Sequence, residues 1–386
     1  MLLQRFPAFL VHVQAILLVN DNIRLSTFRT VLGDKIMDTK ELISLLLTKA
    51  KTSIRDFTII FLANVKDMTA NHYDYADSSI LTEFLSMEEY NELLTALQNW
   101  GFYTLTYFNT EDFIKDYFND KFANSKLIVF EGTQKGIGKA RDSYIPAFCD
   151  LEGLLHTGPN AYVNSICANK YHWTKLLEKH DISVPNSWQY YADKWLNNQK
   201  PISNRTLIAK PCYECASIGI HKESVSQYSF EYENYLKRFS MIYNQPLIVQ
   251  EFIFGYEIEV PLIIHRKNPY ILPPVVICKK DNILMGHEFL DFNDIYDDNY
   301  QFCLLSTISS SIEKCIRTEV VKITKILDLE CYTRIDFRVN PYGEFYVTDI
   351  NSYPHIVHHS SFAYAFEQLH IDAEHILPCL IGNILP

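Results

Sequence analysis

The stretch from Arg334 to Pro354, RIDFRVNPYGEFYVTDINSYP, decides how this chain folds, because it predicts a β-hairpin with one strongly polar face. Asn340-Pro-Tyr-Gly343 is typical of a turn, since proline presets φ at the second position. We therefore expect two antiparallel strands at 332–339 and 344–350.

The register of this hairpin determines which side chains meet. If the two strands join directly at the turn, Arg334 faces Asp349 and Asp336 faces Val347. Asp349 is then the diagonal neighbour of Asp336 on the same face. One face carries the polar set Arg334, Asp336, Asp349 and Asn351, and the other carries Ile335, Phe337, Val339, Tyr346, Thr348 and Ile350.

The polar face has the composition of a hard-metal site. Mg²⁺ usually takes one or two carboxylates and completes its octahedron with water and phosphate oxygens. Arg334 beside these oxygens suits a phosphate or a developing oxyanion. The alternative is a solvated polar face with an exposed Arg–Asp pair, which is common in proteins.

Two lysines upstream favour the metal interpretation. Lys210 ends the apolar strand 206–210 just before Pro211, and Lys170 begins a helix after a loop. A lysine at a buried edge beside a loop of small residues suits phosphate oxygens, with backbone N–H groups as further donors. The alternative is that both lysines lie on the surface. The loop residues concerned are Glu214, Ser217 and Gly219.

Residues 247–257, LIVQEFIFGYE, form an apolar strand that ends near a glycine. Open backbone groups at such an end can pair with a flat heterocycle, and Glu257 could accept from ribose hydroxyls. The alternative is an ordinary core hairpin. The chain contains neither G-x-x-x-x-G-K-[ST] nor G-x-G-x-x-G, which argues against a P-loop protein and a nicotinamide enzyme.

The rest of the chain alternates elements in two styles. In the first third, strands expected at 57–65, 102–108 and 127–130 alternate with a helix at 85–100, which favours an open parallel α/β lobe. Ser86 and Glu89 have the spacing of a capping box at the start of that helix. Further on we expect helices at 171–180, 229–242 and 306–327 and antiparallel strands at 206–210, 218–220, 247–252 and 257–264.

Together these stretches resemble the ATP-grasp superfamily, and within it the D-alanine–D-alanine ligase-like branch, over roughly residues 125–386. The resemblance implies an α/β fold of three lobes: an N-terminal open parallel α/β lobe and two α+β lobes that enclose ATP. The expected boundaries are 1–169, 170–256 and 257–386.

The resemblance also implies an ATP site. Two lysines would hold the α- and β-phosphates, a loop would close over the γ-phosphate, a hinge would line the adenine, and a glutamate would bind ribose. In that order the residues are Lys170 and Lys210; Glu214, Ser217 and Gly219; Gln250, Glu251 and Ile253; and Glu257.

The metal and catalytic roles follow from the same resemblance. Asp336, Asp349 and Asn351 would hold two Mg²⁺ ions, with Asp349 bridging and Mn²⁺ as a substitute. Arg334 would stabilise the transferring phosphoryl group and the tetrahedral intermediate.

The substrate half departs from the family pattern. Glu83 is a weak match for the glutamate that holds the first substrate's ammonium group, and Ser360 matches the serine that binds the acceptor carboxylate. His355 stands where the family has a glycine, and the acceptor-binding Lys-Tyr pair has no clear counterpart within 285–297. We therefore expect the ATP half to be retained and the substrate half to be altered.

The function implied is ATP-dependent amide formation between a carboxylate and an amine, with amino acids as substrates and a dipeptide or peptide-like product of specialised metabolism. One alternative is an ATP-grasp small-molecule kinase, and another is a degenerate nucleotide-binding protein that regulates a partner. The resemblance also allows a homodimer.

Composition limits the partners and the compartment. The net charge is −11 and no basic run is present, so nucleic acid and anionic membranes are not expected as partners. Nine scattered cysteines, including the close pair Cys212 and Cys215, favour a reduced cytoplasmic chain over a disulfide scaffold or a zinc site. The apolar run 6–19 is expected to be a buried strand rather than a signal peptide.

Overall fold

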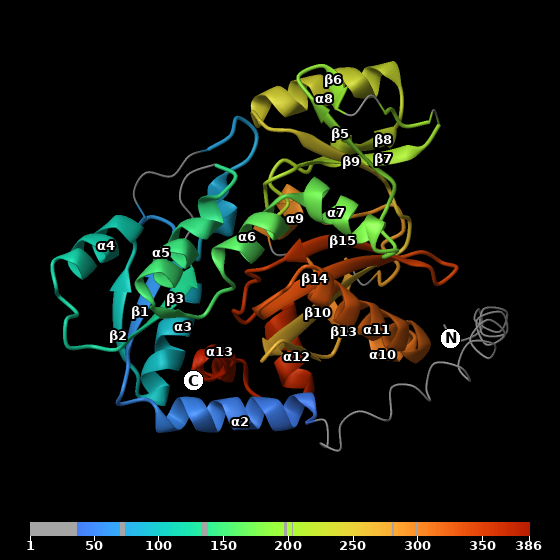
Figure 1. The fold of residues 1–386 in the computed structure, drawn as a ribbon. Helices are drawn as coiled ribbons and strands as arrows, with labels where there is room; N and C mark the ends of the chain where they lie inside the picture. Colours follow the sequence, from blue (N-terminus) through green and yellow to red (C-terminus); the bar gives the residue numbers. More distant parts are fainter. Residues whose placement is uncertain are drawn as a thin grey trace.

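The computed structural model describes residues 37–69, 74–132, 138–196, 199–202, 204–279, 282–297 and 299–386. The strand expected at 6–19 lies outside these residues. Figure 1 shows three β-sheets with helices around them, the N-terminal sheet on the left, the middle sheet at the top and the third sheet below it.

The N-terminal sheet is parallel, in the strand order β2-β1-β3-β4, as alternating strands and helices predict. Ser86 and Glu89 form the predicted capping box of α3, and Gly101 ends this helix at a φ of 91°. The elements are β1 Thr58–Ala63, η1 Ile80–Glu83, α3 Met87–Trp100, β2 Tyr103–Tyr107, α4 Thr110–Phe118, β3 Leu127–Gly132, η2 Arg141–Ser143, α5 Tyr144–Glu152, β4 Leu155–His156 and α6 Ala161–Ala168.

The middle sheet is antiparallel, in the order β6-β5-β9-β7-β8, and α8 packs against it. The strand expected at 218–220 is absent, because Ile218 N–H donates to Cys215 O and forms a turn instead. The elements are α7 Lys170–Lys179, β5 Ser187–Tyr191, β6 Lys194–Leu196, β7 Thr206–Pro211, η3 Lys222–Ser224, β8 Val225–Gln227, α8 Phe230–Ile242 and β9 Leu247–Glu251.

The third sheet follows the order β13-β12-β10-β14-β15, with β11 paired to β10. The helix expected at 306–327 is divided at Ser309, whose extended backbone ends α10 and whose hydroxyl caps α11. The elements are β10 Tyr256–His265, β11 Asn268–Ile271, β12 Val275–Cys278, α9 Phe292–Tyr296, β13 Gln301–Leu304, α10 Leu305–Ile308, α11 Ser310–Ile326, β14 Cys331–Val339, β15 Phe345–Asn351, α12 Ser361–Gln368, η4 Ala373–His375 and α13 Ile376–Ile384.

One hydrophobic core joins the first and the last parts of the chain. Helix α2, Thr39–Thr52, lies beside α13, and both contribute buried side chains to this core (Figure 1). Gly382 makes the contact close, because a Cβ there would lie 2.0 Å from Leu46 O. This shared core does not test the lobe boundaries expected at 169/170 and 256/257, which remain predictions.

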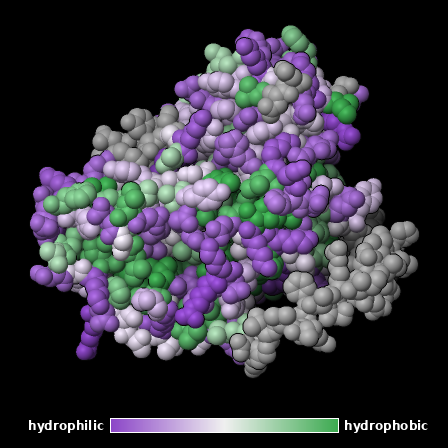
Figure 2. Space-filling view, viewed as in Figure 1, coloured by the Kyte–Doolittle hydropathy of each residue, from purple (hydrophilic) through white to green (hydrophobic). Residues whose placement is uncertain are grey.

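Polar residues are spread over much of the face drawn in Figure 2, with apolar residues in smaller areas between them. In the part of the chain that the structure describes, no helix has the length and apolarity needed to cross a membrane.

Candidate active site

The turn of the β14–β15 hairpin differs from the expected one. Asn340 N–H donates to Glu344 O at 2.9 Å, and the Asn340 side chain accepts from the Glu344 N–H at 3.0 Å. Val339 therefore pairs with Phe345 rather than Glu344, so the strands do not join directly at the turn.

A β-bulge then shifts the pairing by a further residue. Thr348 has no partner in the register, so Asp336 faces Asp349 and Arg334 faces Asn351. The predicted pairs of Arg334 with Asp349 and Asp336 with Val347 are wrong. The predicted grouping of these four polar residues on one face is nevertheless what the structure shows, because directly opposed residues share a face.

The bulge also changes the apolar face. Val347 is fully buried and packs in the core with Phe337, which it faces. Tyr346 faces Arg338, so it belongs to the polar face, contrary to the prediction. The bulge thus places Val347 on the apolar face and Tyr346 on the polar face.

Arg334 joins the hairpin to the neighbouring strand. It donates from Nε and Nη2 to the two carboxylate oxygens of Asp336, each at 2.8 Å, and its Nη1 lies 3.2 Å from Glu259 Oε1. Glu259 faces Asp336 across β10 and β14. Sequence reasoning missed Glu259, although its position two residues after Glu257 places both on one face of β10.

Lys170 and Lys210 approach the same hairpin from the middle part of the chain. Lys170, at the start of α7, donates to both oxygens of Asp349 at 2.9 and 2.8 Å. The charge of Lys210, at the end of β7, also acts on Asp349. In Figure 1, α7 and β15 lie where the middle and the third sheets meet. The structure therefore brings both predicted phosphate ligands to the predicted metal ligands.

The titration of these groups reflects their crowding. Burial raises the pKa of Asp336 to about 7, and the charges of Glu259 and Asp349 add to this against the opposing effect of Arg334. Burial would also raise the pKa of Asp349, but Lys170 and Lys210 outweigh it and hold the pKa below its usual value.

These residues fit a divalent cation. Asp336 and Asp349 supply carboxylate oxygens, and Asn351 supplies an amide oxygen that already accepts from Tyr353 N–H at 2.9 Å. Added positive charge would stabilise the ionised form of Asp336, whose pKa is raised, and oxygen donors suit Mg²⁺. The donor set therefore agrees with the predicted metal.

The predicted adenine hinge follows β9. Gln250 is 2% exposed, and its amide nitrogen has no hydrogen-bond partner among the described residues, as expected for a donor that faces a ligand. The Glu251 carboxylate accepts from Asn186 at 3.0 Å and lies 3.4 Å from Arg205 Nη1, and the Glu251 N–H donates to Asn186 O at 2.9 Å, so protein groups already contact Glu251. Ile253 lies in the short link between β9 and β10 and is half-buried.

The loop after β7 is docked rather than open. Ala216, Ser217 and Gly219 adopt positive φ angles of 47°, 53° and 79°, and a Cβ at Gly219 would lie 2.7 Å from the Tyr243 ring. The Ser217 hydroxyl donates to Leu290 O at 3.1 Å. Backbone N–H groups in such a loop can face phosphate oxygens.

Glu214 and Glu83 belong to a buried ion-pair network. Arg141, with its side chain 1% exposed, donates to Glu214 at 2.9 Å and to Glu83 at 3.0 Å. Tyr75 and Gln245 also donate to Glu214, at 2.6 and 2.7 Å. Glu214 is thus held by protein groups, and Glu83 already faces an internal cation. Arg141 carried no motif that would have revealed this role.

The acceptor side is less complete. Ser360 is buried and caps α12 by accepting from Ala363 N–H at 3.1 Å, whereas His355 is exposed. Lys279, which follows β12, pairs with Asp294 in the segment 282–297. Ser360 and His355 both lie in the chain that follows the hairpin. The described part of 285–297 contains no Lys-Tyr pair.

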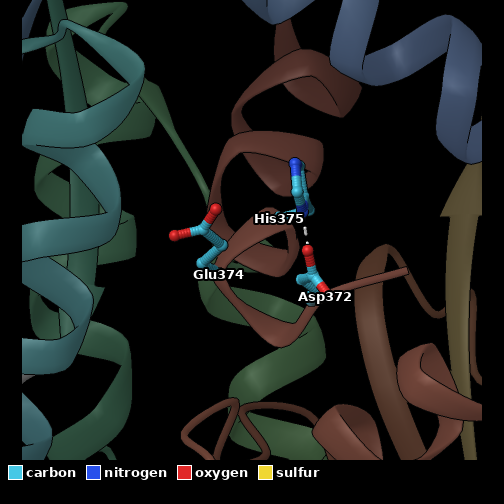
Figure 3. A group of neighbouring side chains, drawn as sticks. All are labelled: Asp372, Glu374 and His375. Atoms are coloured by element: carbon cyan, nitrogen blue, oxygen red, sulfur yellow. Dashed lines mark hydrogen bonds between the residues drawn. The ribbon is translucent and has the colours of Figure 1, made fainter. Parts of the chain in front are cut away.

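A second group of metal-type ligands lies elsewhere, at Asp372, Glu374 and His375 before α13 (Figure 3). Their ligand atoms lie within 4.8 Å of one another, but the two acids are exposed. The broad surface depression beside them shares no residue with the hairpin site. Exposed acidic groups of this kind are common without an ion, so we place the chemistry at the hairpin.

Comparisons with known proteins agree with this geometry. A family described as D-ala D-ala ligase C-terminus matches residues 176–382, which is more than half of the chain. The D-alanine–D-alanine ligase of Cupriavidus pinatubonensis is 24% identical over 219 residues, covering 57% of this chain and 64% of that protein. That of Natranaerobius thermophilus is 24% identical over 222 residues, covering 55% and 58%. The chain thus spans about three fifths of these relatives.

Solved structures show the same fold. The D-alanine–D-alanine ligase of Bacillus anthracis complexed with ATP superimposes with a TM-score of 0.63 at 15% identity, covering 85% of this chain and 97% of that one. The predicted α/β fold with three lobes is confirmed.

Proposed function

The chain belongs to the D-alanine–D-alanine ligase family, and we propose that it is an ATP-dependent ligase that joins a carboxylate to an amine. The observation that carries this proposal is the contact of Lys170 with both carboxylate oxygens of Asp349, which faces Asp336, while the charge of Lys210 also acts on Asp349. Cations for a triphosphate and oxygens for Mg²⁺ thereby lie at one place.

The reaction would take two steps. An oxygen of the substrate carboxylate attacks the γ-phosphorus of ATP, the bond to the β-phosphate oxygen breaks, and an acyl phosphate and ADP form. The amine then attacks the acyl carbon, loses a proton, and displaces inorganic phosphate to leave an amide. Each step develops negative charge that positioned cations stabilise.

The two lysines and the residues of the hairpin would serve the first step. Lys170 and Lys210 would hold phosphate oxygens, and Asp336, Asp349 and Asn351 would hold Mg²⁺. Bound Mg²⁺ would neutralise the triphosphate and polarise the phosphoryl group. Arg334, fixed in orientation by Asp336 and Glu259, would face the transferring group with its planar guanidinium.

The docked loop would protect the intermediate. An acyl phosphate is hydrolysed if water reaches it, so the site must exclude solvent. Ser217 and Gly219 lie in a loop already fixed against Leu290 and Tyr243, which supports this role. Glu214 contributes by holding the loop through Arg141 rather than by contacting phosphate.

We infer amino-acid substrates and a dipeptide or peptide-like product of specialised metabolism. Three differences from the family pattern support this: His355 in place of glycine, the missing Lys-Tyr pair, and Glu83 bound to Arg141. If Glu83 stays with Arg141, the first substrate's ammonium group must be held elsewhere.

The decisive experiment is a phosphate-release screen over amino acids and their pairs with ATP and Mg²⁺, followed by mass spectrometry. An amide product with stoichiometric ADP and phosphate supports the proposal. A phosphorylated product without free phosphate would show a kinase, and absence of turnover with every pair would favour a regulatory nucleotide-binding protein.

We also infer a cytoplasmic location, which the nine free cysteines and the requirement for ATP support. The homodimer remains a prediction, to be checked by light scattering of the purified chain.

A further inference from the structure

Arg338 is a buried arginine of β14 that sequence reasoning did not single out. It is 6% exposed and faces Glu257 across β10 and β14. Its Nη1 donates to Glu257 Oε2 at 3.2 Å, and its guanidinium carbon lies 4.8 Å from the centre of the Phe252 ring. The proposed ribose ligand and a hinge residue thus contact one guanidinium.

The same guanidinium holds a segment of chain far away in sequence. We call residues 285–290 the cover segment. Arg338 Nη2 donates to Gly286 O at 3.1 Å and to Glu288 O at 3.2 Å, and also to Gly255 O at 3.2 Å. Three carbonyls from two segments therefore share one nitrogen.

Two glycines let the cover segment lie directly on the hinge. Gly255 and Gly286 exchange backbone hydrogen bonds at 3.2 and 3.1 Å. A Cβ at Gly286, which has a φ of 64°, would lie 3.1 Å from the Phe254 ring, and a Cβ at Gly255 would lie 1.9 Å from Val339 O on β14. The cover segment then continues to Leu290, whose carbonyl accepts from Ser217 in the phosphate loop.

We propose that Arg338 is a positioning residue that holds the Glu257 carboxylate toward the ribose and fixes the cover segment between the adenine hinge and the phosphate loop. The ribose part rests on the proposed function, since it assumes ATP as ligand. Arginine is suited to this task because its planar fork can bind a carboxylate and backbone carbonyls at the same time, whereas a lysine offers one charged point.

Two predictions separate positioning from a merely structural role. Without Arg338, Glu257 is free to rotate, so recognition of the ribose hydroxyls weakens while contacts to phosphate remain. Affinity for ATP should then fall more than affinity for 2′-deoxyATP. The cover segment should also exchange its amide hydrogens faster, because its carbonyl anchors are lost.

The experiment compares the unmodified chain with Arg338→Met, Arg338→Lys and Glu257→Gln. Isothermal titration with Mg²⁺ measures the dissociation constants for ATP and 2′-deoxyATP, and hydrogen exchange follows residues 252–256 and 285–290 without nucleotide. Arg317→Met is the matched control, because Arg317 pairs with Glu313 on the outer helix α11. We expect Arg338→Met to reduce the preference for ATP over 2′-deoxyATP about tenfold, at the lower end of what loss of one hydrogen bond to a charged group causes.

Glu257→Gln should reduce that preference similarly, and the double variant should add little, because both act through one contact. Arg338→Lys should lie between the two extremes and gives the readout if Arg338→Met does not fold. An unchanged preference in all variants would overturn the ribose assignment, and unchanged exchange would overturn the role in the cover segment. Lack of ATP binding by the unmodified chain would instead refute the proposed function together with the ribose part, while the exchange data still decide the cover segment.

Discussion

Two charged regions of the candidate site pair their charges differently. We call them the nucleotide side, around Lys170 and Asp349, and the acid side, around Arg141, Glu83 and Glu214. On the nucleotide side, the Asp349 side chain is 30% exposed and pairs with Lys170, whose side chain is 9% exposed. On the acid side, Arg141 and Glu214 are each 1% exposed and pair with each other, and Arg141 also pairs with Glu83, which is 10% exposed. The first pair can exchange partners, whereas the second is closed within the protein.

This difference teaches how to distinguish a ligand site from a structural network of the same composition. Both regions combine acids and a base at hydrogen-bond distance, so composition does not separate them. Access to the carboxylate does, because a ligand can reach the partly exposed Asp349, whereas Glu214 is enclosed and loss of its partner leaves an uncompensated buried charge. Mutations on the nucleotide side should therefore reduce activity, whereas mutations on the acid side should reduce the stability of the fold.

The largest effect is expected on the nucleotide side. Asp349→Ala should lower ATP turnover by on the order of a thousandfold, because the metal it would bridge supplies several kcal/mol of charge stabilisation. Phosphate release measures turnover, and circular dichroism checks that the variant is folded. Asp328→Ala, which removes an exposed aspartate paired with Lys267, is the control. Near-normal turnover of Asp349→Ala would mean that the hairpin is only structural.

On the acid side the expected change is in stability. Arg141→Met should lower the free energy of unfolding by about 3–5 kcal/mol, because it leaves Glu83 and Glu214 buried without their cation. Urea denaturation measures this value. Arg205→Met removes an exposed partner of Glu251 and should cost about 1 kcal/mol or less. Equal losses in the two variants would contradict the closed network.

His355 tests the acceptor end of the comparison. His355→Gly should change the ranking of amine substrates by about 1–3 kcal/mol, because one side chain in a pocket typically shifts specificity by that amount. KM for ATP should stay within about a factor of three. The measurement is kcat/KM over a panel of amines. A collapsed affinity for ATP with an unchanged ranking would place His355 in the nucleotide site instead.

The smallest effect concerns a surface contact between α3 and the chain that follows the hairpin. His358 Nδ1 lies 2.7 Å from Glu92 on α3, and this hydrogen bond raises the pKa of His358 above its usual value. The stabilisation is therefore complete below about pH 6.5, the ordinary histidine pKa, and is lost as pH rises through the higher folded value. Since His358 is 61% exposed, His358→Gln should cost about 0.5 kcal/mol or less at pH 5.5 and nothing at pH 9. Urea denaturation at both pH values checks this, and a larger loss at pH 9 would be the wrong sign.

Local patterns predicted what depends on neighbours in sequence. Alternation placed Arg334, Asp336, Asp349 and Asn351 on one face, and the Ser86–Glu89 spacing located the start of α3. The register was wrong because it depends on how the Asn340 side chain closes the turn and on the bulge at Thr348, which no simple spacing rule reveals.

Residues that act through distant partners escaped prediction. Glu259 and Arg338 acquire their roles when β10 pairs with β14, and Arg141 acquires its role when two parts of the chain meet. Each looked like an ordinary charged residue in sequence. Their meaning comes from tertiary contacts, which a single sequence does not display.

The packing of α2 on α13 has a consequence for biosynthesis. The buried face of α2, which includes Leu42, Leu46 and Ala50, is covered by a helix that ends at Ile384. During translation this face leaves the ribosome long before its partner is made. The nascent chain therefore carries an apolar helix without this partner through most of its synthesis, which exposes α2 to chaperone capture or aggregation.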